Sequence, residues 1–151
     1  MAEGAKAAPD TEDSMTNSKT ARDFFEACET GQGWDGCKQW CHEDATFSAQ
    51  ADALADVSTV AAYAEWMKGL LVPLPDGHYE LKSFAEDEER GTVTAAAVFH
   101  GTHTVDAGTG APTGKSVAAD YVYVMSFEDG RIRHMTKVWN DMHSLKQLGW
   151  A

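Results

Sequence analysis

His134, Thr136 and Asn140 are three polar side chains separated by even numbers of residues in a run rich in β-forming residues. Side chains at even spacing along a β-strand point to the same face, so we expect these three to lie together. An imidazole with a pKa near neutrality can act as a base, and threonine and asparagine can orient a ligand by hydrogen bonds. For each residue alone, internal hydrogen bonding is the simpler interpretation. The three together favour the polar floor of a pocket.

The face on which they lie follows from a hairpin turn at Asp129-Gly130, because an Asp-Gly pair between two β-rich runs is typical of a two-residue turn. With Glu128 opposite Arg131, the register predicts that Tyr123 faces Thr136. One side of the hairpin then carries Tyr121, Tyr123, Met125, Phe127, Ile132, His134, Thr136, Val138 and Asn140. Each large apolar side chain left in water forfeits roughly 1.5–3 kcal/mol. We therefore expect this side to be covered and to line a pocket for an apolar small molecule.

Two helices precede the hairpin and could cover that face. Apolar residues at helical spacing predict a first helix from residue 18 to the glycines at 31 and 33, and a second over 57–71 that ends before Pro73. The remaining predicted elements are a short helical stretch over 34–40, strands over 45–50, 79–85, 92–104, 117–128 and 131–140, and a closing helix over 142–148. Helices followed by a meander of strands indicate an α+β fold with an antiparallel sheet.

The length of 151 residues suits one domain. We expect it to span 18–151, after a flexible acidic tail over 1–17 that has no apolar period. The formal charge of −12 argues against nucleic acid and anionic membrane surfaces as partners. No window is long and apolar enough for a membrane span, and no secretory signal pattern is present. These features predict a soluble, cytoplasmic protein whose three cysteines are free thiols.

The C-terminal third carries motifs in an order that resembles SnoaL-like proteins of the nuclear transport factor 2-like superfamily. They are FHGTHTVDAGTGAPTGKSV from Phe99, then FEDGRI, and SLKQLGW near the end. The resemblance implies a cone-like fold in which a curved antiparallel sheet wraps around the N-terminal helices and leaves an internal pocket. It also implies a homodimer through the outer sheet face. Members include polyketide cyclases that close a ring by aldol condensation without metal or cofactor, whereas others hydrolyse, isomerise or only bind.

The resemblance implies an acid/base aspartate near the end of the last strand. Counted from the Asp-Gly turn, that position falls on Asn140, and Asp141 follows one place later. A bulge would turn Asp141 into the pocket; alternatively, Asp141 caps the closing helix. The resemblance also makes His103, in the GTH motif, a candidate for polarising a carbonyl, although it could equally be a turn residue bonded to its loop. With His134, these are the candidate catalytic residues.

Two further patterns could suggest a metal or cofactor site, but neither has the required spacing, so we expect no cofactor or metal. Cys37, Cys41 and His42 lack the spacing of a zinc site, so we interpret the cysteines as packing residues. The Gly-rich segment 108–115 contains Pro112 and lacks the strand and spacing of a phosphate loop, so we interpret it as a hairpin loop. Two hypotheses follow: a cofactor-free cyclase, isomerase or hydrolase acting on an apolar carbonyl compound, and a non-catalytic binding or dimerising module.

Overall fold

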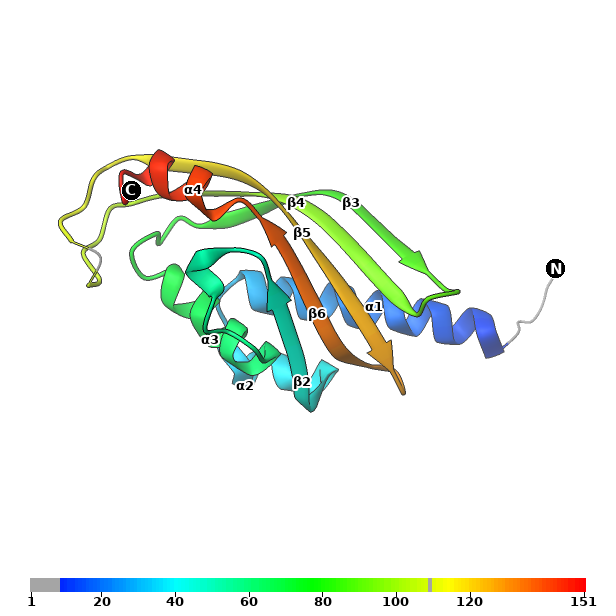
Figure 1. The fold of residues 1–151 in the computed structure, drawn as a ribbon. Helices are drawn as coiled ribbons and strands as arrows, with labels where there is room; N and C mark the ends of the chain where they lie inside the picture. The colour runs from blue at the N-terminus through cyan, green and yellow to red at the C-terminus, as the bar shows by residue number, and fades with distance from the viewer. Residues whose placement is uncertain (1–8, 109) are drawn as a thin grey trace.

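A single curved sheet arches over helix α1 in the computed structural model, which describes residues 9–108 and 110–151 (Figure 1). Within those residues the sheet has five strands in the order β2-β6-β5-β4-β3. All neighbouring strands are antiparallel except β2 and β6, which run parallel. The elements are α1 (Pro9–Glu29), α2 (Gly33–Cys37), η1 (Lys38–Trp40), β2 (Cys41–Ala49), η2 (Asp52–Leu54), α3 (Val60–Leu70), β3 (His78–Asp87), β4 (Thr92–Thr102), β5 (Ser116–Glu128), β6 (Arg131–Trp139) and α4 (Asp141–Leu148). The predicted α+β class and the curved sheet wrapped around N-terminal helices are confirmed.

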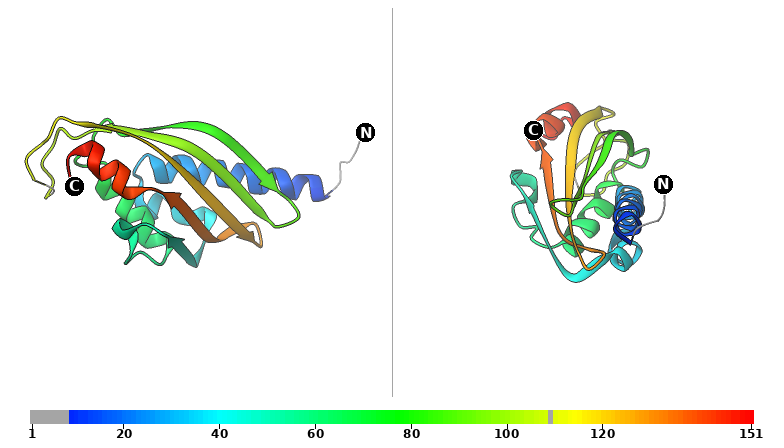
Figure 2. Two further views of the ribbon diagram at one scale, coloured as in Figure 1. Left: turned by 45° about the horizontal axis from the view of Figure 1, so that its top comes forward. Right: turned by 90° about the vertical axis from the view of Figure 1, so that its right-hand side faces the viewer.

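The core lies between the concave face of the sheet and helices α1 and α3 (Figure 2). Helix α1 buries the apolar face that its sequence predicts, with Phe24 and Phe25 fully covered. Helix α3 begins where the hydroxyl of Thr59 accepts a hydrogen bond from the amide of Ala62, a favourable N-cap. The strands contribute alternate residues to the core, as β4 does from Val93 onward.

Helix α1 begins earlier than the sequence pattern indicated. Residues 1–8 of the predicted tail lie outside the described residues, but Pro9 to Glu29 form one helix, so the prediction of a tail is wrong for residues 9–17. Proline is favoured in the first turn of a helix, since its fixed φ is helical and its missing amide hydrogen has no partner there. The helix therefore does not require an apolar period along its whole length.

The register of the hairpin departs from the prediction after the first two residue pairs. Glu128 pairs with Arg131 and Phe127 with Ile132 as predicted, but Ser126 then pairs with His134, which leaves Arg133 as an extra residue. Strand β2 is irregular at the same level, between its pairings with Ile132 and His134. Such a bulge changes the parity of every later residue.

The bulge therefore exchanges the two faces of β6. Met135 and Lys137 are buried on the concave side, with Trp139 packed against the core. The predicted placement of His134, Thr136, Val138 and Asn140 beside Tyr121 and Tyr123 is wrong, because Tyr123 pairs with Lys137 and Tyr121 with Trp139. Val138 consequently points away from the core with 59% of its surface exposed.

Helix α4 closes one end of the arched sheet, beside the β4–β5 loop (Figure 1). Its N-cap is Asn140, whose side-chain oxygen accepts a hydrogen bond from the amide of His143. Its C-cap is Gly149 at φ 77°, a left-handed conformation that favours glycine. Across the described residues, none of the helices is long and apolar enough to cross a membrane.

Candidate active site

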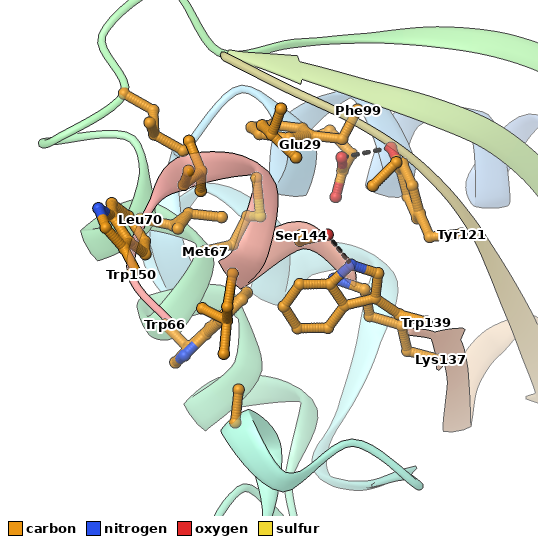
Figure 3. A pocket seen from close by; sticks show the side chains of 16 residues that line it. Glu29, Trp66, Met67, Leu70, Phe99, Tyr121, Lys137, Trp139, Ser144 and Trp150 are labelled. Atoms are coloured by element: carbon orange, nitrogen blue, oxygen red, sulfur yellow. Dashed lines mark hydrogen bonds between the residues drawn. The ribbon is translucent and has the colours of Figure 1, made fainter. Parts of the chain in front are cut away.

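A cavity of about 70 Å³ lies where α3 and α4 meet the concave face of the sheet (Figure 3). Its walls are almost entirely apolar and aromatic, with two ionisable side chains, those of Glu29 and Lys137, reaching it from α1 and β6. The lining residues are Glu29, Ala53, Trp66, Met67, Leu70, Leu74, Phe99, Val117, Ala119, Tyr121, Lys137, Trp139, Ser144, Leu145, Leu148 and Trp150. Such a surface with a few placed polar groups is typical of a small-molecule site.

Glu29 is the last residue of α1 and has only 1% of its surface exposed. Its carboxylate accepts hydrogen bonds from the hydroxyls of Tyr121 and Tyr123, two neighbouring inward-facing residues of β5. Burial raises the pKa of Glu29 above its usual range, whereas the charge of Lys137 and the two hydroxyl donors oppose that rise. The result is a carboxyl group whose proton affinity is increased within an apolar cavity.

Lys137 is 6% exposed and extends from β6 into a ring of aromatic side chains. Its Nζ lies 5.0 Å from the ring centroid of Tyr63, 5.2 Å from Trp66, 5.3 Å from Tyr121 and 4.5 Å from Trp139. Aromatic faces attract a cation, but burial is the larger effect and lowers the pKa of Lys137 to about 8, against the opposing charge of Glu29. A substantial fraction of this amine is therefore neutral at slightly alkaline pH.

A chain of hydroxyl groups joins the amine to the carboxylate. Lys137 Nζ donates to the hydroxyl of Tyr63 at 2.8 Å, that hydroxyl lies 2.9 Å from the hydroxyl of Tyr123, and Tyr123 donates to Glu29. Burial raises the pKa of both tyrosines, so each hydroxyl keeps its proton near neutrality. An uninterrupted chain of this kind can move a proton between its two ends by reversing each hydrogen bond.

Helix α4 fixes the aromatic wall next to Lys137. The indole Nε1 of Trp139 donates to the hydroxyl of Ser144 at 2.8 Å (Figure 3). Trp139 also meets Trp66 edge to face, with ring centroids 5.8 Å apart. These contacts hold the ring over the amine, and they make the closing helix part of the site.

His103 is fully buried but does not line the cavity. Its Nδ1 accepts hydrogen bonds from the amide of Thr113 at 3.1 Å and from the indole of Trp150 at 3.0 Å. Its backbone amide and carbonyl also bond Lys115 and Gly114 across the loop. Of the two interpretations that the sequence left open, these contacts support the turn residue bonded to its loop.

His134 lies on the opposite side of the sheet from the cavity, because of the bulge. Its Nδ1 lies 2.7 Å from the hydroxyl of Thr46, and its Nε2 lies 3.1 Å from that of Ser48 and 3.3 Å from that of Thr136. Together with Thr136, it thus forms a hydrogen-bonded cluster between β2 and β6.

A second, open hollow lies at the ends of β2 and β6. It is lined by Ser48, Ala49, Gln50, Thr136, Lys137, Val138, Trp139, Asn140 and Asp141. Of the residues predicted to bind substrate, Thr136, Val138 and Asn140 line this hollow and only Tyr121 lines the apolar cavity. The others, Tyr123, Met125, Phe127 and Ile132, belong to or pack against the core.

Asp141 is the first residue of α4 and not its cap, a position that Asn140 takes instead. Its carboxylate oxygens accept hydrogen bonds from the amides of Ala53 at 2.8 Å and Met142 at 2.9 Å. Both partners are backbone groups, so Asp141 ties the start of α4 to the segment that contains η2. This bonding argues against a role in proton transfer within the apolar cavity.

The sequence analysis missed Glu29 and Lys137. Glu29 follows Phe25 by four residues and Ala21 by eight, which places a lone acid on the apolar face of its helix. An acidic residue on an otherwise apolar helix face is a sign of a buried charge, and this sign could have identified Glu29. Lys137 could not be found in the same way, since the unbulged register placed it on the outer face.

The cysteine pattern has a packing role in the structure. Cys37 and Cys41 are buried and unpaired by any disulfide, and the Cys41 thiol lies 3.7 Å from the carbonyl oxygen of Cys37. His42 Nε2 instead contacts the carbonyl of Glu128 at 2.6 Å. Among the residues that the structure describes, no three His, Cys, Asp or Glu side chains are arranged to hold a metal ion.

Residues 19–148 match the family model of the SnoaL-like polyketide cyclases. No curated protein sequence matches the chain.

Solved structures with the same fold include AclR from Streptomyces galilaeus, assigned as a hydroxylase, with a TM-score of 0.71 and 21% identity over 91% of this chain and 87% of AclR. IdmH from Streptomyces antibioticus, assigned as a polyketide cyclase, has a TM-score of 0.70 and 20% identity over 88% of this chain and 98% of IdmH. TerC, co-crystallised with polyporic acid, has a TM-score of 0.65 and 11% identity over 89% of this chain and 98% of TerC. At these identities the likeness establishes the fold alone.

Proposed function

This chain belongs to the SnoaL-like polyketide cyclase family, and we propose that it acts on a carbonyl-containing, mostly apolar small molecule by cofactor-free acid/base catalysis. The observation that carries the proposal is the pair of buried ionisable groups, Glu29 and Lys137, on the wall of an apolar cavity. We assign Glu29 as the base that takes a proton from the carbon next to the carbonyl. Lys137 and the tyrosine hydroxyls stabilise the negative charge that develops on the carbonyl oxygen.

The chemistry supports these roles. A carboxylate is a weak base in water, but desolvation raises its pKa and brings it closer to the affinity that proton abstraction requires. A cation or a hydroxyl donor in an apolar site stabilises an enolate oxygen more strongly than in water. The apolar walls suit a ligand of the aromatic or polyketide kind, and TerC, a protein of the same fold, was crystallised with polyporic acid.

Asp141, His103 and His134 are the acid/base candidates that the sequence suggested, and they stay predictions. None of them lines the apolar cavity. Asp141 does border the open hollow, so a ligand seated there would have this carboxylate within its surroundings. A direct comparison of Glu29 with Asp141 therefore decides between the two locations.

The test is exchange of the α-protons of acetone for deuterium, followed by NMR in heavy water. Acetone is small enough for the cavity and needs only the proton-transfer step, so the natural substrate need not be known. We expect the protein to accelerate exchange and Glu29→Gln to reduce the acceleration at least 100-fold, since a positioned base contributes about 10²–10⁴-fold.

Two matched variants complete the experiment. Glu88→Gln makes the same chemical change at an exposed turn and should leave exchange unchanged, and Asp141→Asn should do so if Glu29 is the base. Loss of exchange in Asp141→Asn with retention in Glu29→Gln would transfer the role to Asp141 and refute the assignment to Glu29.

A non-catalytic binding module is the second candidate function. It is favoured by Asn140, an amide at the position where the family resemblance implies an acid, which here caps α4. Native mass spectrometry that finds a retained ligand, together with an absence of proton exchange, would support this function over catalysis.

We further propose a homodimer through the outer sheet face. Val138, an exposed apolar residue near the end of β6, lies on this face. Light scattering after gel filtration should give twice the chain mass, and Val138→Lys should shift it toward the monomer.

A further inference from the structure

Lys137 lines the cavity, so its amine can contact a bound ligand directly. We propose that its Nζ attacks the carbonyl carbon of the ligand and forms an imine, an inference that rests on the proposed function of the cavity. The substrate class is then an aldehyde or an unhindered ketone with its carbonyl at the end of an apolar molecule.

The amine of Lys137 lacks the usual partners of a buried lysine. Buried lysines usually pair with a carboxylate, and others extend their charged end to water. Lys137 does neither, because its Nζ has one hydrogen-bond partner, the hydroxyl of Tyr63, and forms no ion pair within 4.0 Å in the described part of the chain. The remaining directions around Nζ are occupied by aromatic rings and by the cavity.

The hydroxyl chain provides a route to the neutral amine. When one proton moves from Lys137 through Tyr63 and Tyr123 to Glu29, each donor becomes an acceptor and no hydrogen bond is lost. The two charges disappear together, which removes the desolvation cost of both and makes the neutral pair reachable from the ionised one. The lowered pKa of the amine, about 8, agrees with this arrangement.

The step is balanced without any further reactant. The lone pair of Nζ forms a bond to the carbonyl carbon, and the amine proton moves to the carbonyl oxygen to give a carbinolamine. The protonated Glu29 returns its proton through the tyrosines, the carbon–oxygen bond breaks, and water leaves. A protonated imine remains, which withdraws electrons from the adjacent carbon–hydrogen bond more strongly than the carbonyl does.

The cavity limits the part of the ligand that reaches the amine. Its volume of about 70 Å³ is about half that of the roughly 150 Å³ cavity that takes up benzene. A short chain or a terminal acetyl group fits beside Lys137, whereas the rest of a larger ligand must extend toward the cavity mouth. Carbonyls flanked by bulky groups on both sides are excluded.

The experiment is reductive trapping of the full chain with propanal and cyanoborohydride at pH 7.5, followed by peptide mapping. With a pKa of about 8 against about 10.4 for exposed lysines, Lys137 holds roughly 200-fold more neutral amine. We expect Lys137 to be alkylated at least tenfold faster than any exposed lysine, with a rate that rises with pH and levels off above about 8.

Lys137→Arg keeps the cation but cannot form the imine, so it should lose this rapid alkylation. Lys68→Arg, the same change at an exposed residue of α3, should retain it. Should Lys137→Arg fail to fold, the peptide map and pH profile of the unaltered protein decide alone. Alkylation of Lys137 no faster than that of exposed lysines overturns the proposal.

Propan-1-ol separates this proposal from the function on which it rests, since it matches the probe in size and has no carbonyl. Saturation-transfer NMR measures its binding, and we expect it to bind and to slow the alkylation of Lys137. Binding of propan-1-ol without alkylation of Lys137 refutes the imine and leaves the cavity function standing. Absence of both refutes the cavity function as well.

Discussion

Tyr123 occupies the centre of the hydroxyl chain, and replacing it with phenylalanine tests the site without changing any charge. Its hydroxyl, which is fully buried, donates to the Glu29 carboxylate and contacts the hydroxyl of Tyr63 at 2.9 Å. A hydrogen bond to a charged group contributes about 1.5–3 kcal/mol and a neutral one about 0.5–1.5 kcal/mol. We therefore expect Tyr123→Phe to lower the free energy of unfolding by roughly 2–4.5 kcal/mol at pH 7.

The assay is equilibrium unfolding in urea, with Tyr79→Phe as the matched control. Tyr79 also donates its hydroxyl to a glutamate, but that partner, Glu26, is exposed on α1. Removal of an exposed contact of this kind should cost less than about 1 kcal/mol. Equal losses in the two variants would show that the buried network contributes no special stability.

Acidification gives the experiment a second readout. The hydrogen bond from Tyr123 lowers the pKa of Glu29, so without it the folded-state pKa of Glu29 rises further. Above the pKa that Glu29 has in the variant, the hydrogen bond makes its full contribution to the free energy of unfolding. This contribution decreases as the pH falls below that pKa. The difference between the wild type and Tyr123→Phe should therefore shrink on acidification, and a constant difference would contradict an ionised Glu29.

Three further predictions address other parts of the structure. The pKa of Lys137 is about 8 in the folded protein against its ordinary 10.5, so the folded state releases this proton at lower pH than the unfolded state does. The free energy of unfolding, measured in urea, should therefore rise by roughly 1 kcal/mol between pH 7.5 and 9 in the wild type relative to Lys137→Met. Deletion of Arg133 leaves every strand pair of the hairpin intact and should be tolerated, whereas deletion of Thr136 turns Lys137 outward and should abolish the cooperative thermal transition. His103→Ala removes the acceptor for two donors and should cost about 2–4 kcal/mol, with faster proteolysis of the β4–β5 loop as the independent readout.

The fold could be predicted from the sequence because its local patterns agree with its tertiary structure. The Asp-Gly turn gave the hairpin, the glycines at 31 and 33 marked the end of α1, and the prolines after α3 marked the end of that helix. The parallel pairing of β2 with β6 was not predicted, since nothing local to residues 41–49 specifies a partner far along the chain.

The site could be predicted only in part, and Tyr121 is the predicted pocket residue that lines the cavity. His103 and Asp141 stay predicted candidates, and for each of them the sequence also left a structural role open. The GTH histidine, His103, holds the β4–β5 loop against the C-terminus, and Asp141 holds the start of α4. A motif marks a position where one residue type is needed, but it does not say why. A hydrogen bond that fixes a loop can require a particular residue just as a catalytic step can.

The bulge at Arg133 determines which side chain of β6 enters the cavity, and so it determines the chemistry of the site. In a regular hairpin Thr136 and Val138 would face Tyr123 and Tyr121, and the pocket would hold an acid without a nearby cation. The extra residue brings Lys137 opposite Tyr123 instead. A buried glutamate without a cation in reach would stay protonated over a wider pH range, whereas with Lys137 the same group can exchange its proton through the tyrosines. One inserted residue, four places before Lys137 along the strand, thus adds an amine to a pocket that holds an acid and provides a route between the two groups.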